Sequence, residues 1–261
     1  MKVRVSALKE HEYCPRVIYL RDVMKIEPKP SPEKTKGLLG HAVRKELSLR
    51  QGKILRRASN INEIHDSIMQ ELKNILADVP FVYKEQLGTT PCQEYLTLME
   101  TEISNEIALM TNRLSVMVSE IGLEEALKLL TPWEVEYSIK SPALNLSGRI
   151  DKVMFQQHRY PVEIKTGEVS ESVWNGDRMQ TCAYAMLLEE KFMQKVPFGF
   201  VEYTRVQEQR PVLTTEQLRR DVLQTRDSVL EILDGKVPDI CPHGSGRKCE
   251  SCGYSDVCYT V

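Results

Sequence analysis

Apolar residues recur along the chain with two different periods, and the period changes near Trp133. Before Trp133 they recur at about every third or fourth position, which is the repeat of an amphipathic helix. The repeat is clearest between Tyr95 and Ile121. Helices are therefore predicted over residues 6–24 (interrupted at Pro15), 37–50, 62–76, 94–121 and 123–130.

After Trp133 the repeat shortens to two residues, which is typical of a strand with one buried face. Helical repeats return twice, and the second begins at a capping pattern formed by Thr214 and Gln217. Strands are predicted over residues 133–139, 146–155, 159–165, 198–204 and 211–213, and helices over 179–192 and 215–233. A helical region is thus followed by a region that combines strands and helices.

The composition is that of an ordinary globular protein. Hydrophobic residues make up 41% of the 261 residues and charged residues 28%, which argues against disordered, collagen-like and coiled-coil proteins. The net charge of −2 differs from that of a strongly basic protein that coats nucleic acid. Any contact with nucleic acid must therefore come from a local patch, and basic residues do gather over residues 36–57.

The chain has no apolar run long enough to span a membrane, and its first residues form no apolar signal segment. We therefore expect a cytoplasmic protein without a membrane partner. Seven cysteines in a reducing compartment favour a metal or cluster site over disulfides.

Two acids and a lysine lie on two consecutive predicted strands. Asp151 is on the first strand, and Glu163 and Lys165 are two residues apart on one face of the second. A hairpin would bring Asp151 beside Glu163, and a divalent cation would neutralise the two carboxylates. The alternative is a surface hairpin with alternating charges, but the apolar neighbours Ile150 and Ile164 disfavour it.

Three further polar residues are candidates for the same site. Gln180 and Tyr184 are four residues apart on one face of a predicted helix. His41 follows Gly37 on another helix and would supply a third ligand, because imidazole is a common metal ligand. A packing role remains the alternative for each of them.

The cysteines near the end of the chain form a compact group. Cys249, Cys252 and Cys258 have the short spacing of thiolates that bind one centre. Cys241 as fourth ligand would make a local zinc knuckle, whereas Cys14 would join both ends of the chain and suit an iron–sulfur cluster. Spacing leaves both possibilities open. Cys92 and Cys182 stand alone and are expected to be structural.

Six short motifs, taken in order, resemble those of the CRISPR-associated Cas4 nucleases. This family belongs to the RecB-like branch of the PD-(D/E)XK nucleases. The resemblance extends over nearly the whole chain, although Ile150 replaces the proline of the family's PD pair. The motifs are E-Y-C-P-R (Glu12–Arg16), G-x-x-x-H (Gly37–His41), G-R-I-D (Gly148–Asp151), V-E-I-K-T-G (Val162–Gly167), Q-x-x-x-Y (Gln180–Tyr184) and C-x2-C-x5-C (Cys249–Cys258).

The resemblance implies a role for each candidate residue. His41, Asp151, Glu163 and the Ile164 carbonyl would bind Mn²⁺ or Mg²⁺. Lys165 would be the catalytic lysine, and Gln180 and Tyr184 would orient the substrate strand and the active site. The residues implied to hold a [4Fe–4S] cluster are Cys14, Cys249, Cys252 and Cys258, and those expected to bind the DNA backbone are Arg44, Lys45, Arg50 and Lys53.

The resemblance also implies a fold and an activity. We expect an α/β restriction-endonuclease-like core, with a mixed central sheet flanked by helices and a helical insertion. The expected divisions are 1–36 with the first cluster cysteine, 37–131 with the metal-binding histidine, 132–235 as nuclease core and 236–261 as cluster segment. The expected activity is a single-stranded DNA exonuclease with some endonuclease activity, used in CRISPR spacer acquisition and antiviral defence.

The expected partners are single-stranded DNA, or duplex DNA with overhangs, and the CRISPR integrase proteins. Two alternatives stay open on the sequence. One is a RecB-like nuclease of DNA repair or of a mobile element, because the same active site serves both. The other is a non-enzymatic DNA-binding scaffold with a zinc knuckle, in which the hairpin carboxylates would be incidental.

Overall fold

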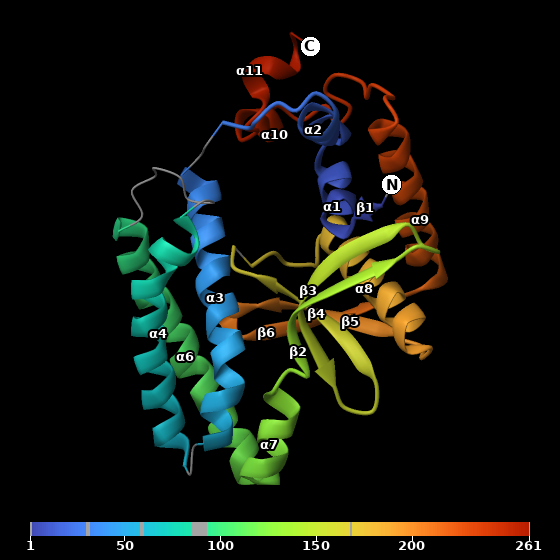
Figure 1. Ribbon diagram of the computed structural model, residues 1–261. Coiled ribbons are helices and arrows are strands. Elements are labelled where there is room, and N and C mark those ends of the chain that lie inside the picture. Colours follow the sequence, from blue (N-terminus) through green and yellow to red (C-terminus); the bar gives the residue numbers. More distant parts are fainter. Residues whose placement is uncertain (1, 30–31, 58–59, 85–92, 168, 261) are drawn as a thin grey trace.

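The computed structural model describes residues 2–29, 32–57, 60–84, 93–167 and 169–260 (Figure 1). Its centre is a mixed six-stranded sheet with the order β1-β3-β4-β5-β6, and β2 pairs with β3. The neighbours β4 and β5 are parallel, whereas β2–β3, β3–β4 and β5–β6 are antiparallel. The strands are β1 (Val3–Arg4), β2 (Glu134–Ser141), β3 (Leu146–Phe155), β4 (Arg159–Lys165), β5 (Phe198–Tyr203) and β6 (Glu208–Leu213).

Helices from both ends of the chain cover the sheet. The buried helix α8 (Asn175–Phe192) packs on β4 and β5, and α1 (Val5–Tyr13) and α9 (Glu216–Leu233) pack on α8. One apolar core joins these elements and includes Val5, Ile150, Val162 and Leu187. The prediction of a mixed sheet flanked by helices is therefore confirmed.

The remaining long helices form a separate layer, which we call the helical lobe. It consists of α3 (Pro32–Arg57), α4 (Ile61–Val82), α6 (Gln93–Ile121) and α7 (Leu123–Leu130), and it has its own apolar core. The lobe meets the sheet through β2 and the short 3-10 helix η2 (Thr204–Val206). In Figure 1 it stands beside the sheet, on the side away from α9.

The two ends of the chain meet at a third place. After α1 come α2 (Pro15–Ile18) and the π-helix η1 (Tyr19–Val23), and the last residues form α10 (Gly246–Glu250) and α11 (Ser255–Cys258). The Arg16 guanidinium donates to the carbonyls of Cys258 and Pro238 at 2.8–3.1 Å. Figure 1 shows α2 beside α10 and α11 at one end of the molecule.

The structure differs from the sequence-based expectations at a few element ends. The strand β1 was not predicted, because two residues show no period of their own and pair only in the folded chain. The helix α3 begins at Pro32, five residues before the predicted start at residue 37, since proline suits the first turn of a helix. The cap of α9 is Thr215, whose side chain accepts from Leu218 N at 3.2 Å, and not Thr214.

Cys182 is fully buried in α8, in agreement with a structural role, whereas Cys92 lies outside the described residues. No helix within the described ranges has both the length and the apolar character needed to cross a bilayer.

Candidate active site

The hairpin of β3 and β4 brings together the two acids that the sequence singled out. Asp151 lies on β3 with 7% of its surface exposed, and its Oδ2 accepts from Ile164 N on β4 at 2.7 Å. This bond fixes the Asp151 carboxylate next to the position of Glu163. Burial and the negative charge of Glu163 raise the pKa of Asp151 well above its ordinary value. The site therefore concentrates negative charge that a cation would relieve.

Glu163 has one satisfied oxygen and one free oxygen. Its Oε1 accepts from Lys165 Nζ at 2.9 Å and from Gln180 Nε2 at 2.8 Å. Its Oε2 is buried and has no hydrogen-bond partner among the described residues. Because an unpaired buried carboxylate oxygen is costly, this atom is suited to a metal ion.

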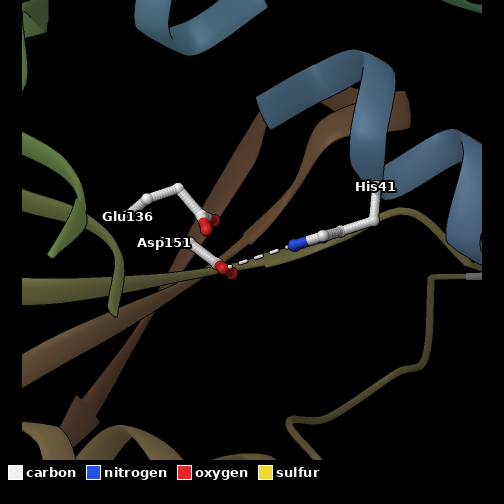
Figure 2. A group of neighbouring side chains, drawn as sticks. All are labelled: His41, Glu136 and Asp151. Carbon is white, nitrogen blue, oxygen red and sulfur yellow. Dashed lines mark ion pairs between the residues drawn. The ribbon is translucent and has the colours of Figure 1, made fainter. Parts of the chain in front are cut away.

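His41 reaches the same place from the helical lobe. Its Nε2 lies 3.5 Å from Asp151 Oδ1, and Figure 2 shows the ring directed at that carboxylate. Burial lowers the pKa of His41, which keeps the imidazole neutral near pH 7. A neutral imidazole is the form that binds metals. Thus three of the predicted ligand residues meet from different elements, His41 from α3, Asp151 from β3 and Glu163 from β4.

Glu136 is a functional candidate that the sequence analysis missed. Among the described residues, His41, Glu136 and Asp151 place one ligand atom each within 4.8 Å of one another (Figure 2). Val135 pairs with Lys152 and Tyr137 with Ile150, so Glu136 stands opposite Asp151 across the β2–β3 ladder.

The backbone and neighbours of Glu136 also distinguish it. Its φ of +56° is unusual for a residue with a side chain. Two cations approach its carboxylate, Arg149 Nε at 2.6 Å and Lys45 Nζ at 3.3 Å. Only the strand register could have revealed Glu136, because the sequence alone does not specify which residues of two antiparallel strands face each other.

Lys165 remains charged within the site. Burial lowers its pKa, but the nearby carboxylates of Glu163 and Asp177 outweigh burial and raise it above the usual value. Its ammonium lies 2.9 Å from Glu163 Oε1 and 2.9 Å from Asp177 Oδ1.

Gln180 and Tyr184 join the active site to α8. Gln180 donates to Glu163, and the Tyr184 hydroxyl donates to the carbonyl of Arg149 on β3 at 2.9 Å. A β-carbon at Gly148 would lie 2.7 Å from the Tyr184 ring and 3.2 Å from Val5. The glycine of the G-R-I-D motif therefore allows α8 and α1 to approach β3.

A cavity of about 780 Å³ opens over these groups. His41, Glu136, Asp151 and Glu163 line it, together with a set of basic side chains that the sequence analysis did not select. These are Arg4, Lys140 and Arg149.

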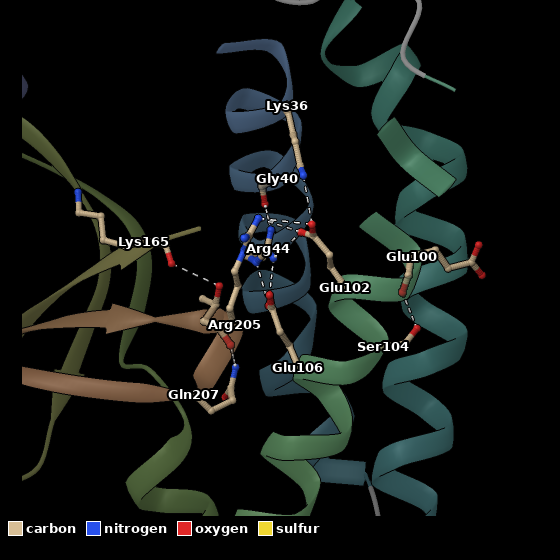
Figure 3. Close-up of polar contacts among 11 residues, drawn as sticks. Lys36, Gly40, Arg44, Glu100, Glu102, Ser104, Glu106, Lys165, Arg205 and Gln207 are labelled. Atoms are coloured by element: carbon tan, nitrogen blue, oxygen red, sulfur yellow. Dashed lines mark hydrogen bonds and ion pairs between the residues drawn. The ribbon is translucent and has the colours of Figure 1, made fainter. Parts of the chain in front are cut away.

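The structure corrects the predicted DNA contact of Arg44, whereas those of Lys45, Arg50 and Lys53 stay predictions. Arg44 is 4% exposed and donates to both oxygens of Glu106 on α6, so it stabilises the helical lobe and is not available to DNA (Figure 3). Arg50 pairs with Glu71 at 2.9 Å and with Asp78 at 3.2 Å. Lys45 faces Glu136, and Lys53 is exposed. The Ile164 amide is used by Asp151, and metal binding by its carbonyl stays a prediction.

The cysteines gather around a second, much smaller cavity of about 20 Å³. Cys241 Sγ lies 3.7 Å from Cys249 Sγ, and the Tyr259 hydroxyl lies 2.6 Å from Cys241 Sγ. Burial raises the pKa of Cys14, and the nearby thiols of Cys258 and Cys252 add to the rise. The cysteines that line this cavity are Cys14, Cys241, Cys249, Cys252 and Cys258.

Comparison with known proteins agrees with this geometry. The chain is similar to the "CRISPR-associated exonuclease Cas4" of Francisella tularensis subsp. novicida (strain U112), with 28% identity over 178 residues. That match covers 67% of this chain and 84% of the relative. The family model of the PD-(D/E)XK nuclease superfamily matches residues 3–259. With a mixed sheet that carries the D…E-x-K residues at a cavity, the chain belongs to the PD-(D/E)XK nuclease superfamily.

Proposed function

We propose that this nuclease is a metal-dependent exonuclease that acts on single-stranded DNA. The observation that carries the proposal is the convergence of His41, Asp151 and Glu163 from three elements on one cavity, with the Lys165 ammonium bonded to Glu163. A surface hairpin with incidental charges would not bury these carboxylates or leave Glu163 Oε2 unpaired.

His41, Asp151 and Glu163 would hold a Mn²⁺ or Mg²⁺ ion, with Glu136 as a further carboxylate beside them. A neutral imidazole and hard carboxylate oxygens suit these ions. Such an ion supplies Lewis-acid activation of the scissile phosphate and of the attacking water. The unpaired Glu163 Oε2 supports this assignment, since its partner Oε1 is already bonded to Lys165 and Gln180.

The residues of the chain perform the other tasks. Lys165 keeps its positive charge and would stabilise the extra negative charge that develops on the phosphate. Gln180 holds Glu163 in place, and Tyr184 fixes α8 against β3. These contacts preorganise the site, so little reorganisation is needed during the reaction.

The basic lining of the cavity supports a nucleic-acid substrate, for which we propose single-stranded DNA. Arg4, Lys140 and Arg149 line the cavity and would bind backbone phosphates irrespective of sequence. The Francisella relative is named an exonuclease. We therefore expect binding that weakens as salt increases, because phosphate contacts release counterions.

We further propose that a [4Fe–4S] cluster joins the chain ends through Cys14, Cys249, Cys252 and Cys258. All four thiols line one cavity together with Cys241. Cluster binding across so long a loop would stabilise the fold strongly. Iron and acid-labile sulfide should be present in the wild type, lost in Cys14→Ser and retained in Cys241→Ser. Iron that disappears only from Cys241→Ser would contradict the choice of Cys14.

We also propose a role in CRISPR spacer acquisition, in which this chain trims DNA together with integrase proteins. The relative's name, a CRISPR-associated exonuclease, supports the CRISPR context of this role. Co-expression with the integrase proteins and affinity capture of the nuclease should recover them. Capture of the nuclease alone would favour a role in DNA repair or in a mobile element.

The central test is incubation of the protein with end-labelled single- and double-stranded DNA. With Mn²⁺ we expect single-stranded DNA to be shortened from an end, and a chelator should stop the reaction. Cleavage that persists in the chelator, or intact DNA with Mn²⁺, would contradict the proposal.

A further inference from the structure

Beyond the motif residues, the structure shows a row of four alternating charges that ends at the metal-ligand candidate Glu163. Lys9 Nζ lies 2.8 Å from Asp177 Oδ1, and the same oxygen lies 2.9 Å from Lys165 Nζ. Lys165 in turn donates to Glu163 Oε1 at 2.9 Å. We propose that Asp177, supported by Lys9, is a positioning residue that holds Lys165 for catalysis.

Asp177 lies in the first turn of α8 and is almost completely buried, with 4% of its surface exposed. Burial raises the pKa of Asp177, but the charges of Lys165 and Lys9 outweigh burial and hold it below the usual value. Asp177 is therefore a carboxylate in the folded protein. A buried charge of this kind persists only when cations face it, and both of its cations come from outside α8.

The need for Asp177 follows from the chemistry of an ammonium group. A lysine side chain is long, and its ammonium has three donors that rotate freely. With Glu163 alone as partner, Lys165 could turn toward any free oxygen of the metal site. Asp177 draws the ammonium from a second direction, which leaves the third donor for the water or phosphate that reacts.

The position of Lys9 is fixed at both ends of α1. At one end, Val5 lines the cavity and would touch a β-carbon on Gly148. At the other end, the Tyr13 hydroxyl donates to Lys248 O at 2.7 Å, and Lys248 Nζ donates to Tyr13 O at 3.0 Å. The helix α1 thus connects the C-terminal cysteine segment with the row of charges.

Gly176 allows Lys9 to come this close. A β-carbon at Gly176 would lie 3.1 Å from Lys9 Cγ and 3.3 Å from Lys9 Cα. One turn further along α1, Asn175 Nδ2 donates to Glu12 Oε2 at 2.8 Å. This second α1–α8 contact does not touch Lys165, so a variant at Glu12 is a matched control.

The inference rests on the proposed nuclease activity, and the experiment separates the two. Single-turnover cleavage of end-labelled single-stranded DNA is measured at saturating Mn²⁺ for the wild type, D177N, K9M, K9R, E12A and the double variant D177N/K9M. DNA affinity in Ca²⁺, Mn²⁺ affinity by calorimetry and the melting temperature are measured in parallel. K9M changes a half-exposed side chain and tests the proposal even where D177N is unstable.

We expect D177N to lower the cleavage rate by about 10- to 100-fold, because a small misplacement of a catalytic group is costly. DNA and Mn²⁺ affinities should stay within about threefold of wild type, since neither residue is placed at the phosphate or the metal. K9M should lower the cleavage rate by less than D177N does, and K9R, which keeps the positive charge, should cleave at nearly the wild-type rate. The double variant D177N/K9M should cleave at the same rate as D177N alone. E12A should cleave like the wild type.

Two sets of results would overturn the inference. D177N that cleaves at the wild-type rate would show that Lys165 needs no second carboxylate. Equal losses in E12A and K9M, or additive losses in D177N/K9M, would show that the contacts only hold α1 on α8. A wild-type protein that leaves DNA intact would instead refute the proposed function, and the inference with it.

Discussion

Two groups of buried carboxylates lie on one sheet, and their surroundings are opposite. Asp151 on β3 and Glu163 on β4 form the first group, and Glu202 on the next strand, β5, forms the second. Glu202 on β5 is satisfied by Lys152 Nζ at 2.8 Å and Gln209 Nε2 at 3.0 Å. Asp151 on β3 faces further acids and has a raised pKa, whereas the pKa of Glu202 is lowered. The two carboxylates are similarly buried but differ in their partners. Glu202 is paired with a cation of the fold, whereas Asp151 lies beside other acids and is suited to a metal cation.

The largest expected difference between the groups is in the rate of cleavage. Asp151→Asn should lower it by about 10³-fold, since it removes a metal ligand whose charge stabilises the reaction. Its melting temperature should not fall, because a neutral side chain relieves the repulsion that raises the pKa of Asp151. Single-turnover cleavage and calorimetry measure both quantities.

The matched control is Glu202→Gln, which changes a buried carboxylate outside the cavity. It should keep the cleavage rate within about threefold of wild type and lower the melting temperature. If Glu202→Gln lost as much activity as Asp151→Asn, the distinction between the two groups would fail.

The next largest effect should be on stability, through the cation that pairs with Glu202. Lys152→Met leaves the Glu202 carboxylate buried without its cation and should destabilise the fold by about 3 kcal/mol. Urea unfolding measures this value. The double variant Lys152→Met/Glu202→Leu should recover most of it, because an apolar pair has no charge to desolvate. An unchanged unfolding midpoint in Lys152→Met would contradict the pairing.

Addition of Mn²⁺ should change the free energy of unfolding differently in variants of the two groups, by somewhat less than Lys152→Met changes it. Mn²⁺ at about 100 times its dissociation constant should raise the free energy of unfolding by about 2.7 kcal/mol, because it binds only the folded site. Glu202→Gln should show the same rise, and Asp151→Asn should show little of it. Equal stabilisation of all three proteins would place the ion elsewhere, and removal with a chelator should reverse the effect.

The residues of the active site differ in how well they could be predicted from the sequence. Asp151, Glu163 and Lys165 could be predicted, because period-two alternation gives the face of each strand and a short turn pairs β3 with β4. His41 followed only from a motif, since nothing local indicates that α3 meets β3. Glu136 was missed because the register of β2 on β3 is set by the folded sheet.

Long-range pairing explains why the prediction for Arg44 is wrong. Arg44 was expected to contact DNA, but Glu106 lies 62 residues further along the chain and the pairing depends on how α3 packs on α6. Asp177 and Lys9 likewise belong to no sequence pattern, because α1 and α8 meet only in the folded core. Local periodicity predicts elements and their faces, whereas partners distant in sequence need the structure.

The smallest expected effect is the dependence of stability on pH at Glu202. Burial raises the pKa of Glu202, but the charge of Lys152 outweighs burial, so the pKa lies below its ordinary value. The folded state then binds fewer protons than the unfolded state, whose glutamate pKa is about 4.3. The contribution of Glu202 is complete above that pH and is lost as the pH falls through its folded pKa.

The difference in unfolding free energy between wild type and Glu202→Gln should therefore be constant at about pH 6 to 8 and decrease below about pH 4. Urea titrations at several pH values measure it, and Asp221→Asn, which changes an acid that accepts from Gln217 on its own helix α9, is the control. A difference that stays constant down to about pH 3 would show that the Lys152 charge does not lower the Glu202 pKa. Because an uncompensated buried acid would respond to pH in the opposite direction, the sign of this change alone distinguishes a paired carboxylate from one left for a cation.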